Sequence, residues 1–291
     1  MKKCKFMMAI LGAMILFSPI LAEDLDESSG ESSAPVANSG VPKPGNGVST
    51  FFGGSSAPDG VPTLVLNYNF FSTTHTQGAR VYRNMFVPVL RVGVGKQWDI
   101  SLQVPMNFTI QNGKRTTNGA VGRATLWAHK QHLAEKFGDS MLMVATSYSV
   151  SIPTSSGMNG FWGFGFGVGL TWNYLSHRLI FDFNATANTN KNNPDLFIKA
   201  GYHYAFNDYL YTGLELNWDT VPYKNLYNGY SKDGSHTLYI GPMLSVKIPE
   251  LHNSAWGVGF FWDVVNQYQN PQVQVKWKEA WRLTSRITAS F

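Results

Sequence analysis

The 291-residue chain has little cysteine, little charge and no long apolar stretch after its start. Its single cysteine excludes a disulfide-stapled secreted domain. Asp, Glu, Lys and Arg make up 14% of the residues, against roughly 25% in ordinary soluble domains, which disfavours a cytosolic enzyme. Beyond residue 22 no apolar run approaches the ~20 residues that a membrane-spanning helix needs. A helical membrane protein is therefore excluded as well.

Aromatic residues (14%) and glycine (28 residues) are abundant instead. At a mean hydropathy of −0.14, the apolar residues must be mixed closely with polar ones. Such mixing is typical of β-strands that have one apolar and one polar face. The composition therefore favours an all-β fold.

Residues 1–22 have the layout of a bacterial secretory signal peptide. Three lysines within the first five residues precede an apolar stretch, and Ala22 stands before an acidic residue. We expect cleavage after Ala22, and a retained anchor helix is the alternative. Cys4 lies ahead of the apolar stretch and cannot be the lipid-modified cysteine of a lipoprotein. The mature chain would then contain no cysteine.

Residues 23–60 differ in composition from the rest of the chain. They are rich in Ser, Gly and Pro and carry six acidic residues against one lysine, whereas residues 61–291 have a net charge of +7. We expect 23–60 to be a flexible periplasmic leader. The alternative is an acidic plug that enters a basic lumen. Residues 61–291 would then form the folded domain.

Residues 98–110 show the clearest strand pattern. Every even position from Trp98 to Ile110 is apolar, and every odd one is polar or proline. Because successive strand side chains point to opposite faces, the apolar ones share one surface. The run would extend over about 40 Å, which is longer than a typical strand of a soluble protein. The pattern indicates a tilted membrane strand.

The same period recurs and predicts about 12 strands. The expected ranges are about 63–72, 84–94, 98–110, 120–132, 141–152, 163–174, 178–188, 195–206, 209–218, 237–247, 255–264 and a last strand that runs to the C-terminus. In 163–174, glycines occupy one face and large apolar residues the other. This arrangement fits a wall that meets lipid outside and stays open, or accommodates something, inside.

The expected connections alternate between tight turns and longer polar loops. The turns are 95–97, 134–140, 176–177, 207–208 and 248–254, and the loops are 73–83, 111–119, 153–162, 189–194, 219–236 and 265–273. This alternation predicts a transmembrane antiparallel up-and-down β-barrel with periplasmic turns and extracellular loops. An even strand number places both ends of the chain on the periplasmic side of the outer membrane.

Aromatic residues mark the ends of the expected strands. Phe291, in register with the last strand, resembles the C-terminal assembly signal of bacterial outer-membrane barrels, which implies the barrel-assembly machinery as a partner. Outer-membrane lipids are the other expected partner, because aromatic girdles meet the two membrane interfaces. The girdle candidates are Trp98, Tyr174, Tyr209, Trp218, Trp256 and Trp281.

The parity that turns apolar residues outward turns charged residues toward the lumen. The candidate lumen-lining residues are Arg91, Arg123, Lys199, Lys276, Lys278, Arg282, Arg286, Asp99, Asp182 and Glu215, with Arg83, His129, Lys247 and Asp263 on the same face. On the lipid face, an Arg or Lys at mid-depth would cost roughly 2–4 kcal/mol. Basic residues outnumber acidic ones in this set.

Two interpretations of the lumen charges stay open. In one, the basic excess biases the pore toward anionic solutes. In the other, neighbouring strands pair most of the charges. The expected pairs are Arg91–Asp99, Lys199–Glu215 and Asp263–Lys276. We expect pairing for most of the set, which leaves Arg123, Arg282 and Arg286 to face a solute in a narrow channel.

No motif points to catalysis or to cofactor chemistry. The seven histidines are scattered over loops, turns and strands, and no paired-histidine metal spacing occurs. The glycine run at 163–169 is not followed by a helix pattern, so a nucleotide-binding loop is not expected. The basic residues are spread around a wall, which disfavours nucleic-acid binding. We expect no catalytic residues, no metal and no cofactor.

Several short motifs resemble a known family. They are Tyr82-Arg83, Pro88 with Leu90-Arg91-Val92-Gly93-Val94, the run from Trp98 to Pro105, the block from Gly122 to Leu133, and Ile152-Pro153-Thr154 with the glycine-rich stretch 157–169. Over residues 63–291 the chain resembles the family of outer-membrane transporters associated with the MetA pathway of phenol degradation, although Arg123 stands where that family has Asp. The resemblance implies a barrel that passes small organic solutes.

Two functions are compatible with these features. The first is a passive outer-membrane channel for small organic solutes through a narrow, mildly basic lumen. The second is a surface barrel that displays its extracellular loops for adhesion or interaction, without transport. The longest expected loop, 219–236, carries three tyrosines that could serve such display.

Overall fold

The computed structural model describes residues 53–54, 56–57, 59–74, 80–95, 97–111, 114–115, 120–154, 161–189, 194–221, 225–227, 230–232, 235–248, 254–268 and 280–291. The signal peptide expected at 1–22 and most of the leader expected at 23–60 therefore lie outside the described residues. Within the described ranges, no helix has the length and apolarity needed to cross a membrane.

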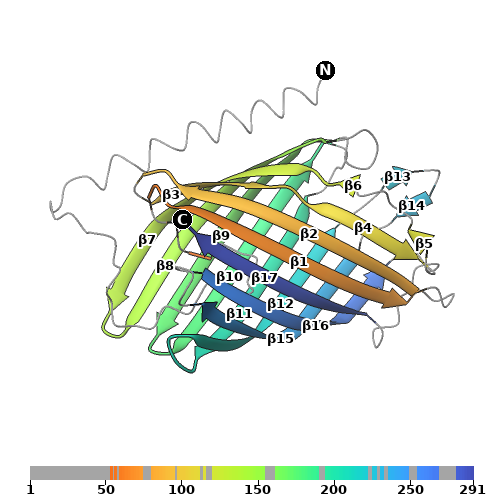
Figure 1. The fold of residues 1–291 in the computed structure, drawn as a ribbon. Helices are drawn as coiled ribbons and strands as arrows, with labels where there is room; N and C mark the ends of the chain where they lie inside the picture. Colours follow the sequence, from red (N-terminus) through yellow and green to blue (C-terminus); the bar gives the residue numbers. More distant parts are fainter. Residues whose placement is uncertain are drawn as a thin grey trace, which may run out of the picture. The chain divides into compact units, whose positions relative to one another are not determined.

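The described secondary structure consists of β-strands (Figure 1). The strands are β1 (Pro62–Thr74), β2 (Arg80–Gly93), β3 (Trp98–Gln103), β4 (Met106–Gln111), β5 (Lys114–Arg115), β6 (Ala120–Val121), β7 (Ala124–Phe137), β8 (Ser140–Ile152), β9 (Gly163–Tyr174), β10 (His177–Asn188), β11 (Asp195–Ala205), β12 (Leu210–Val221), β13 (Asn225–Tyr227), β14 (Tyr230–Lys232), β15 (Ser235–Ile248), β16 (Ser254–Tyr268) and β17 (Trp281–Ser290). Their period-two alternation of polar and apolar residues is the pattern that strands require.

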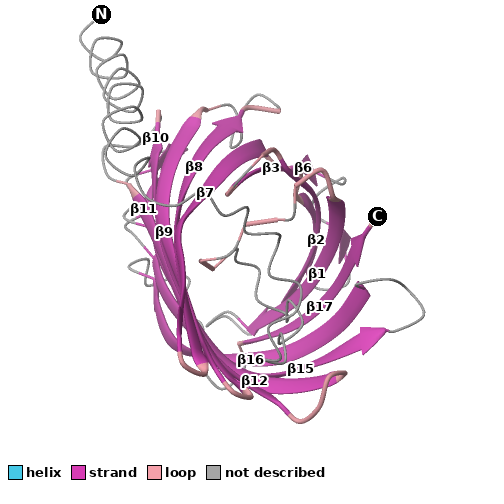
Figure 2. Cartoon of the chain, turned by 90° about the vertical axis from the view of Figure 1, so that its left-hand side faces the viewer, coloured by secondary structure: helices cyan, strands magenta, loops and turns pink. Residues whose placement is uncertain are grey.

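The sheet closes into a barrel because β1 pairs antiparallel with both β2 and β17. At the seam, Thr63 lies opposite Ser290, and Phe291 N donates to Pro62 O at 2.9 Å. β3 and β4 both pair with β2, one after the other along its length, and together they count as one strand of the wall. β6 and β7 form the next strand of the wall in the same way. Counted so, the barrel has 12 strands. The predicted 12-strand antiparallel barrel is confirmed, and Figure 2 looks along it.

One predicted strand is interrupted. The expected strand 98–110 breaks at Val104 and Pro105, between β3 and β4, because proline has no N–H to donate to the ladder. The neighbouring strand of the wall is also interrupted there, between β6 and β7, where Gly122 N donates to Pro105 O at 2.6 Å. A Cβ at Gly122 would lie 2.6 Å from Pro105 Cγ, so a side chain there would collide with the ring. The fourth predicted strand is also longer than expected, since β7 continues to Phe137.

Short turns gather at one end of the barrel and long connections at the other. The β7–β8 and β9–β10 turns occupy 138–139 and 175–176, and Gly138 and Leu175 adopt the positive φ that such tight turns need. This short-turn end, at the left of Figure 1, also carries both ends of the barrel domain. The opposite, long-loop end carries β5 and the β13–β14 hairpin.

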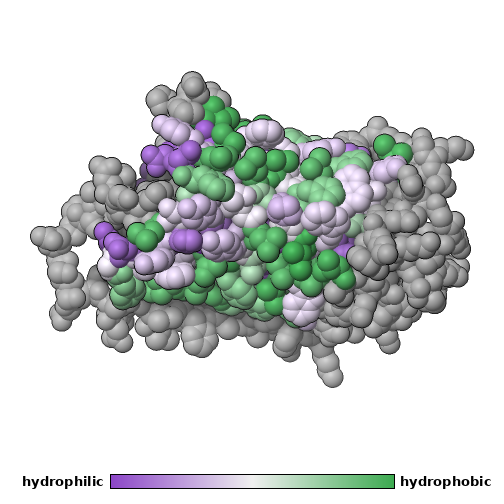
Figure 3. All heavy atoms as spheres, turned by 90° about the horizontal axis from the view of Figure 1, so that it is seen from below, coloured by the Kyte–Doolittle hydropathy of each residue, from purple (hydrophilic) through white to green (hydrophobic). Residues whose placement is uncertain are grey.

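The wall reverses the burial pattern of a soluble protein. Large apolar side chains are exposed on its outer face, including Leu90, Ile100, Leu102, Leu126, Phe166, Leu170, Leu179, Phe181, Leu214, Leu244, Trp262 and Ile287. Figure 3 shows one side of this face, with hydrophobic residues over the middle and the strongest hydrophilic colour toward the short-turn end. Exposed Tyr174, Tyr209 and Trp256 lie near the short-turn end, and Trp218 lies near the other. Lipid contact accounts for this exposure.

This polarity predicts unequal costs for arginine on the two faces of the wall. Leu170 faces outward near the middle of β9, and Ser149 faces the lumen on β8. We expect Leu170→Arg to destabilise the barrel in vesicles by about 2–4 kcal/mol, because a guanidinium at mid-depth must leave water. Ser149→Arg is the matched control and should cost less than half as much. Urea unfolding of the refolded protein measures both, and equal losses would contradict the assignment of the faces.

Candidate functional site

The inner face of the barrel is polar and largely buried from solvent. Its buried side chains include Thr63, Asn67, Asn69, Asp99, Ser101, His129, Ser147, Ser149, Ser151, Thr171, Arg178, Asp182, His203, Glu215, Asn217, Ser245, Asp263, Thr284 and Thr288. Polar groups buried in this number define the inside of the cylinder as the place where a polar solute or a polypeptide can be accommodated.

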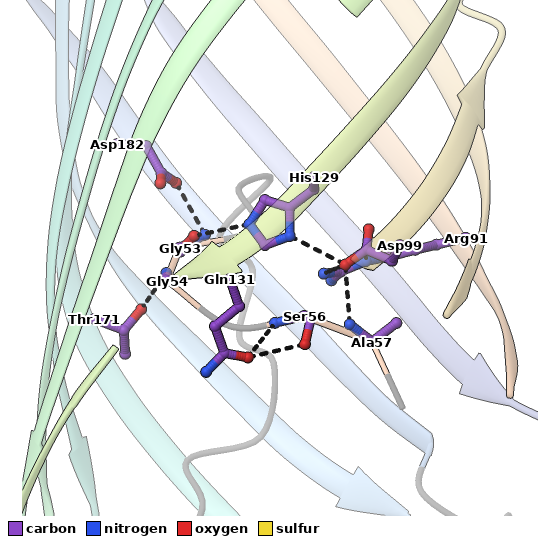
Figure 4. Close-up of polar contacts among 10 residues, drawn as sticks. All are labelled: Gly53, Gly54, Ser56, Ala57, Arg91, Asp99, His129, Gln131, Thr171 and Asp182. Carbon is purple, nitrogen blue, oxygen red and sulfur yellow. Dashed lines mark hydrogen bonds and ion pairs between the residues drawn. The ribbon is translucent and has the colours of Figure 1, made fainter. Parts of the chain in front are cut away.

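Part of the chain ahead of β1 lies in this lumen. We call residues 53–60 the internal segment; its described residues are Gly53, Gly54, Ser56, Ala57, Asp59 and Gly60. Gly60 N donates to Gly93 O at 3.1 Å at the short-turn end, and from there the segment follows the inner wall past β3, β7, β8 and β9 to β10. Loop segments are visible inside the ring of strands in Figure 2, and Figure 4 shows the contacts.

Hydrogen bonds attach the internal segment to β3 and β7 first. Ala57 N donates to Asp99 Oδ2 at 3.0 Å. Ser56 donates to Gln131 Oε1 from its backbone N at 3.2 Å and from its hydroxyl at 2.8 Å. These backbone N–H groups lie away from any sheet ladder, so wall side chains satisfy them.

The two glycines of the internal segment are held at the far side of this path. Gly54 N donates to Thr171 Oγ1 at 2.9 Å, and Gly53 N donates to Asp182 Oδ2 at 3.4 Å. Gly53 has φ +58°, where a side chain would be strained, and a Cβ there would lie 2.4 Å from Thr171 Oγ1. The Gly-Gly pair therefore lets the chain turn flat against the wall.

The glycine-rich face of β9 makes room for this approach. A Cβ at Gly169 would lie 2.1 Å from Gly53 O and 2.7 Å from Asp182 Oδ1. Two residues along the strand, a Cβ at Gly167 would lie 2.0 Å from Asn184 Oδ1. The expectation that this face accommodates something is confirmed at Gly169, where the occupant is the chain's own internal segment.

Asp99 joins the internal segment to the wall. Its carboxylate accepts from Arg91 Nε at 2.8 Å and Arg91 Nη2 at 2.5 Å, and it lies 3.1 Å from His129 Nδ1 (Figure 4). The other ring nitrogen, His129 Nε2, lies 3.3 Å from Gly53 O. Since both of these partners of His129 are acceptors, a ring that carries both protons makes both bonds and a neutral ring makes one. The expected Arg91–Asp99 pair is confirmed.

The expected leader thus has two parts. Residues 23–52 lie outside the described residues, and the described residues between 53 and 60 contact the inner wall. The contacts come from backbone N–H and C=O groups and from the Ser56 hydroxyl. Asp59, the one acidic residue among them, accepts from Gly95 N at 2.6 Å at the rim. The acidic character of the leader therefore plays no part in its described contacts with the lumen.

A second polar region lies toward the long-loop end. Arg282 on β17 projects inward among three rings, with its guanidinium carbon 4.6 Å from the Phe261 centroid, 4.8 Å from Tyr239 and 5.8 Å from Phe71. Phe71 has a second arginine beside it, since the guanidinium carbon of Arg83 lies 5.9 Å from the Phe71 ring centroid. We call Arg282 and these three rings the arginine cage.

The remaining predicted lumen residues fall at separate places. Arg123 is held at the long-loop end, where its Nη1 donates to Asn188 Oδ1 at 2.7 Å and its guanidinium carbon lies 4.1 Å from the Phe161 centroid. Because of these two contacts, Arg123 is less free to meet a solute than we expect from the sequence. Arg286 lies opposite Asn67, where β17 pairs with β1. Lys276 and Lys278 lie outside the described residues, ahead of the start of β17.

The register places the expected Lys199–Glu215 pair on a diagonal. Lys199 lies directly opposite Asp182 on β10 and Asn217 on β12, whereas Glu215 lies opposite Gly201. This is the diagonal relation that the sequence predicts for the pair. Glu215 Oε1 also lies 3.3 Å from His203 Nε2, on the same pair of strands. Asp263 is fully buried on β16, and its expected partner Lys276 is among the residues not described.

Several contact residues were missed by the sequence reasoning. Arg178 and His203 have inward parity on β10 and β11 and could have been found by it. Gln131 and Thr171 are uncharged, and only knowledge of what lies in the lumen identifies them. Within the described ranges, no group of three or more His, Cys, Asp or Glu residues could hold a metal ion.

The closed barrel, apolar outside and polar inside, defines a transmembrane β-barrel protein. No family model matches the chain, so the resemblance to the phenol-degradation family is not confirmed, and no curated protein matches it. A solved structure, the COG4313 outer membrane channel from Pseudomonas putida F1, is similar to it at a TM-score of 0.64 and 12% identity, covering 82% of this chain and 98% of that one. Two further solved structures have lower TM-scores. OccAB3 of Acinetobacter baumannii has a TM-score of 0.39 at 9% identity, covering 79% of this chain and 98% of that one. The NalP translocator domain of Neisseria meningitidis has a TM-score of 0.40 at 12% identity, covering 81% of this chain and 89% of that one.

Proposed function

We propose that this protein is a bacterial outer-membrane channel that passes small organic solutes through a narrow, mildly basic lumen. In this arrangement the short turns and both ends of the barrel domain are periplasmic and the long loops are extracellular. The observation that carries the proposal is a polar lumen with a layer of the chain's own backbone laid along its wall. The fold shared with a P. putida outer membrane channel supports it.

The internal segment defines the bore in this proposal. It occupies the lumen at the short-turn half, where its attachments to Asp99, Gln131, Thr171 and Asp182 spread over the strands from β3 to β10. A 12-strand barrel is already narrow compared with porins of 16 or more strands. A segment inside it leaves a passage for small solutes only.

Surface display is the second candidate function. At the long-loop end, β13 pairs antiparallel with β14, with Asn225 opposite Lys232 and Tyr227 opposite Tyr230. This pairing in the longest loop favours a surface that another molecule could recognise. This function does not require an open lumen.

Single-channel recording in planar bilayers separates the two functions. A channel gives stepwise currents in KCl, and a salt gradient should give a reversal potential of the sign for anion preference, because basic residues exceed acidic ones on the inner face. Arg286→Gln should reduce that preference. Lys130→Gln is the matched control, since Lys130 stacks on Trp98 with its Nζ 5.3 Å from the ring centroid, on the outer face. A refolded but electrically silent barrel would overturn the channel and favour display.

A further inference from the structure

The arginine cage has features of a ligand site that the wall structure alone does not require. Arg282 makes neither an ion pair nor a hydrogen bond with any described residue, and its Nε is buried without a partner. Its contacts are the faces of Phe261, Tyr239 and Phe71. A guanidinium has five N–H donors and no acceptor, and no described residue accepts from those of Arg282.

Three rings surround the guanidinium of Arg282. Phe261 is 1% exposed and Tyr239 is 9% exposed, so these two rings lie against the guanidinium of Arg282 and offer little surface of their own. Phe71 is partly exposed and lies between Arg282 and the exposed Arg83. Since Nε is buried, only the two Nη atoms can meet a ligand. Two parallel N–H donors match the two oxygens of a carboxylate.

Acidic residues act on this arginine through space. Glu215 and Asp219 on β12 and Asp263 on β16 all interact electrostatically with Arg282, yet none of them forms an ion pair with it. Lys199 and Arg83 add positive charge on the same inner face. Arg83 uses two of its donors on Asn107 Oδ1, at 2.9 and 3.3 Å, so it contributes charge more than free hydrogen bonds.

We propose that the arginine cage binds the carboxylate of small organic acids as they enter the channel from the long-loop end. The carboxylate takes the two Nη groups of Arg282, and the apolar body of the acid lies against Phe71. This inference rests on the proposed channel function and adds the class of solute to it.

Benzoate block of the KCl current tests the proposal. Benzoate added on the long-loop side should reduce the current in a saturable manner, and neutral benzamide should not. Arg282→Lys keeps the charge and loses the paired donors of the planar guanidinium, so we expect the half-blocking concentration to rise about tenfold. Arg123→Lys is the matched control, because that arginine is already bound by Asn188, and it should leave the block unchanged.

A second measurement separates this inference from the channel itself. Isothermal titration calorimetry of benzoate with the refolded full-length protein in detergent detects binding whether or not current flows. A change in gel mobility on heating confirms that each variant is folded. Binding that Arg282→Lys weakens while Arg123→Lys does not supports the cage. Equal block or equal binding by wild type and Arg282→Lys, or equal effects of benzoate and benzamide, overturns it. Absent current with intact, Arg282-dependent binding overturns the channel alone.

Discussion

Deleting residues 23–57 should raise the single-channel conductance roughly twofold or more, because the bore that carries ions sets the current. The deletion removes Gly53, Gly54, Ser56 and Ala57 from the lumen and leaves β1 intact from Pro62. The barrel should still fold, since its closure depends on the ladder between β1 and β17. Recording in planar bilayers under identical salt measures the change.

A pair of glycine substitutions supplies the control for this deletion. Gly169→Ala places a Cβ 2.1 Å from Gly53 O, against backbone that must move away. Gly165→Ala meets the Ser149 hydroxyl at 2.2 Å, a side-chain end that can rotate. We expect Gly169→Ala to give larger and noisier currents and Gly165→Ala to resemble wild type. If the deletion and Gly169→Ala both conducted like wild type, the internal segment would not define the bore.

The fold was predictable because one physical requirement governs every strand. Lipid demands apolar side chains outside, and a closed ladder leaves no unpaired backbone groups, so alternation such as that of 163–174 reveals strand, face and parity together. The prediction failed in detail where a local feature competed with this rule. Pro105 separates β3 from β4 because it lacks an N–H, although the residues on both sides keep the alternation of apolar and polar side chains.

The candidate site was predictable only in part. Parity identifies Asp99, Asp182 and Arg282 as inward residues, and the closeness of Arg91 to Asp99 follows from one hairpin. The internal segment has no periodicity, because its hydrogen bonds go to wall side chains up to 129 residues away in the chain. Likewise, three rings from β1, β15 and β16 meet at Arg282 through the curvature of the closed wall. No local pattern encodes contacts of this range.

Asp99→Ala should lower the free energy of unfolding by about 3–5 kcal/mol, because removing one partner of a buried pair leaves the other charge uncompensated. Asp99 is 0% exposed, and its carboxylate accepts from both Arg91 and Ala57 N and lies against His129. Asp99→Asn keeps the size and one acceptor oxygen, so we expect an intermediate loss. Urea unfolding of the protein refolded in vesicles measures these differences.

Two further variants show whether the loss comes from the stranded charge. Arg91→Met combined with Asp99→Ala should recover part of the stability lost in Asp99→Ala, because no unpaired guanidinium then remains. Asp139→Ala, in the exposed β7–β8 turn, should stay within about 0.5 kcal/mol of wild type. Since Ala57 N also loses its acceptor in Asp99→Ala, that variant should show noisier currents than Asp139→Ala. A stable Asp99→Ala barrel with quiet currents would mean that Asp99 does not hold the internal segment to the wall.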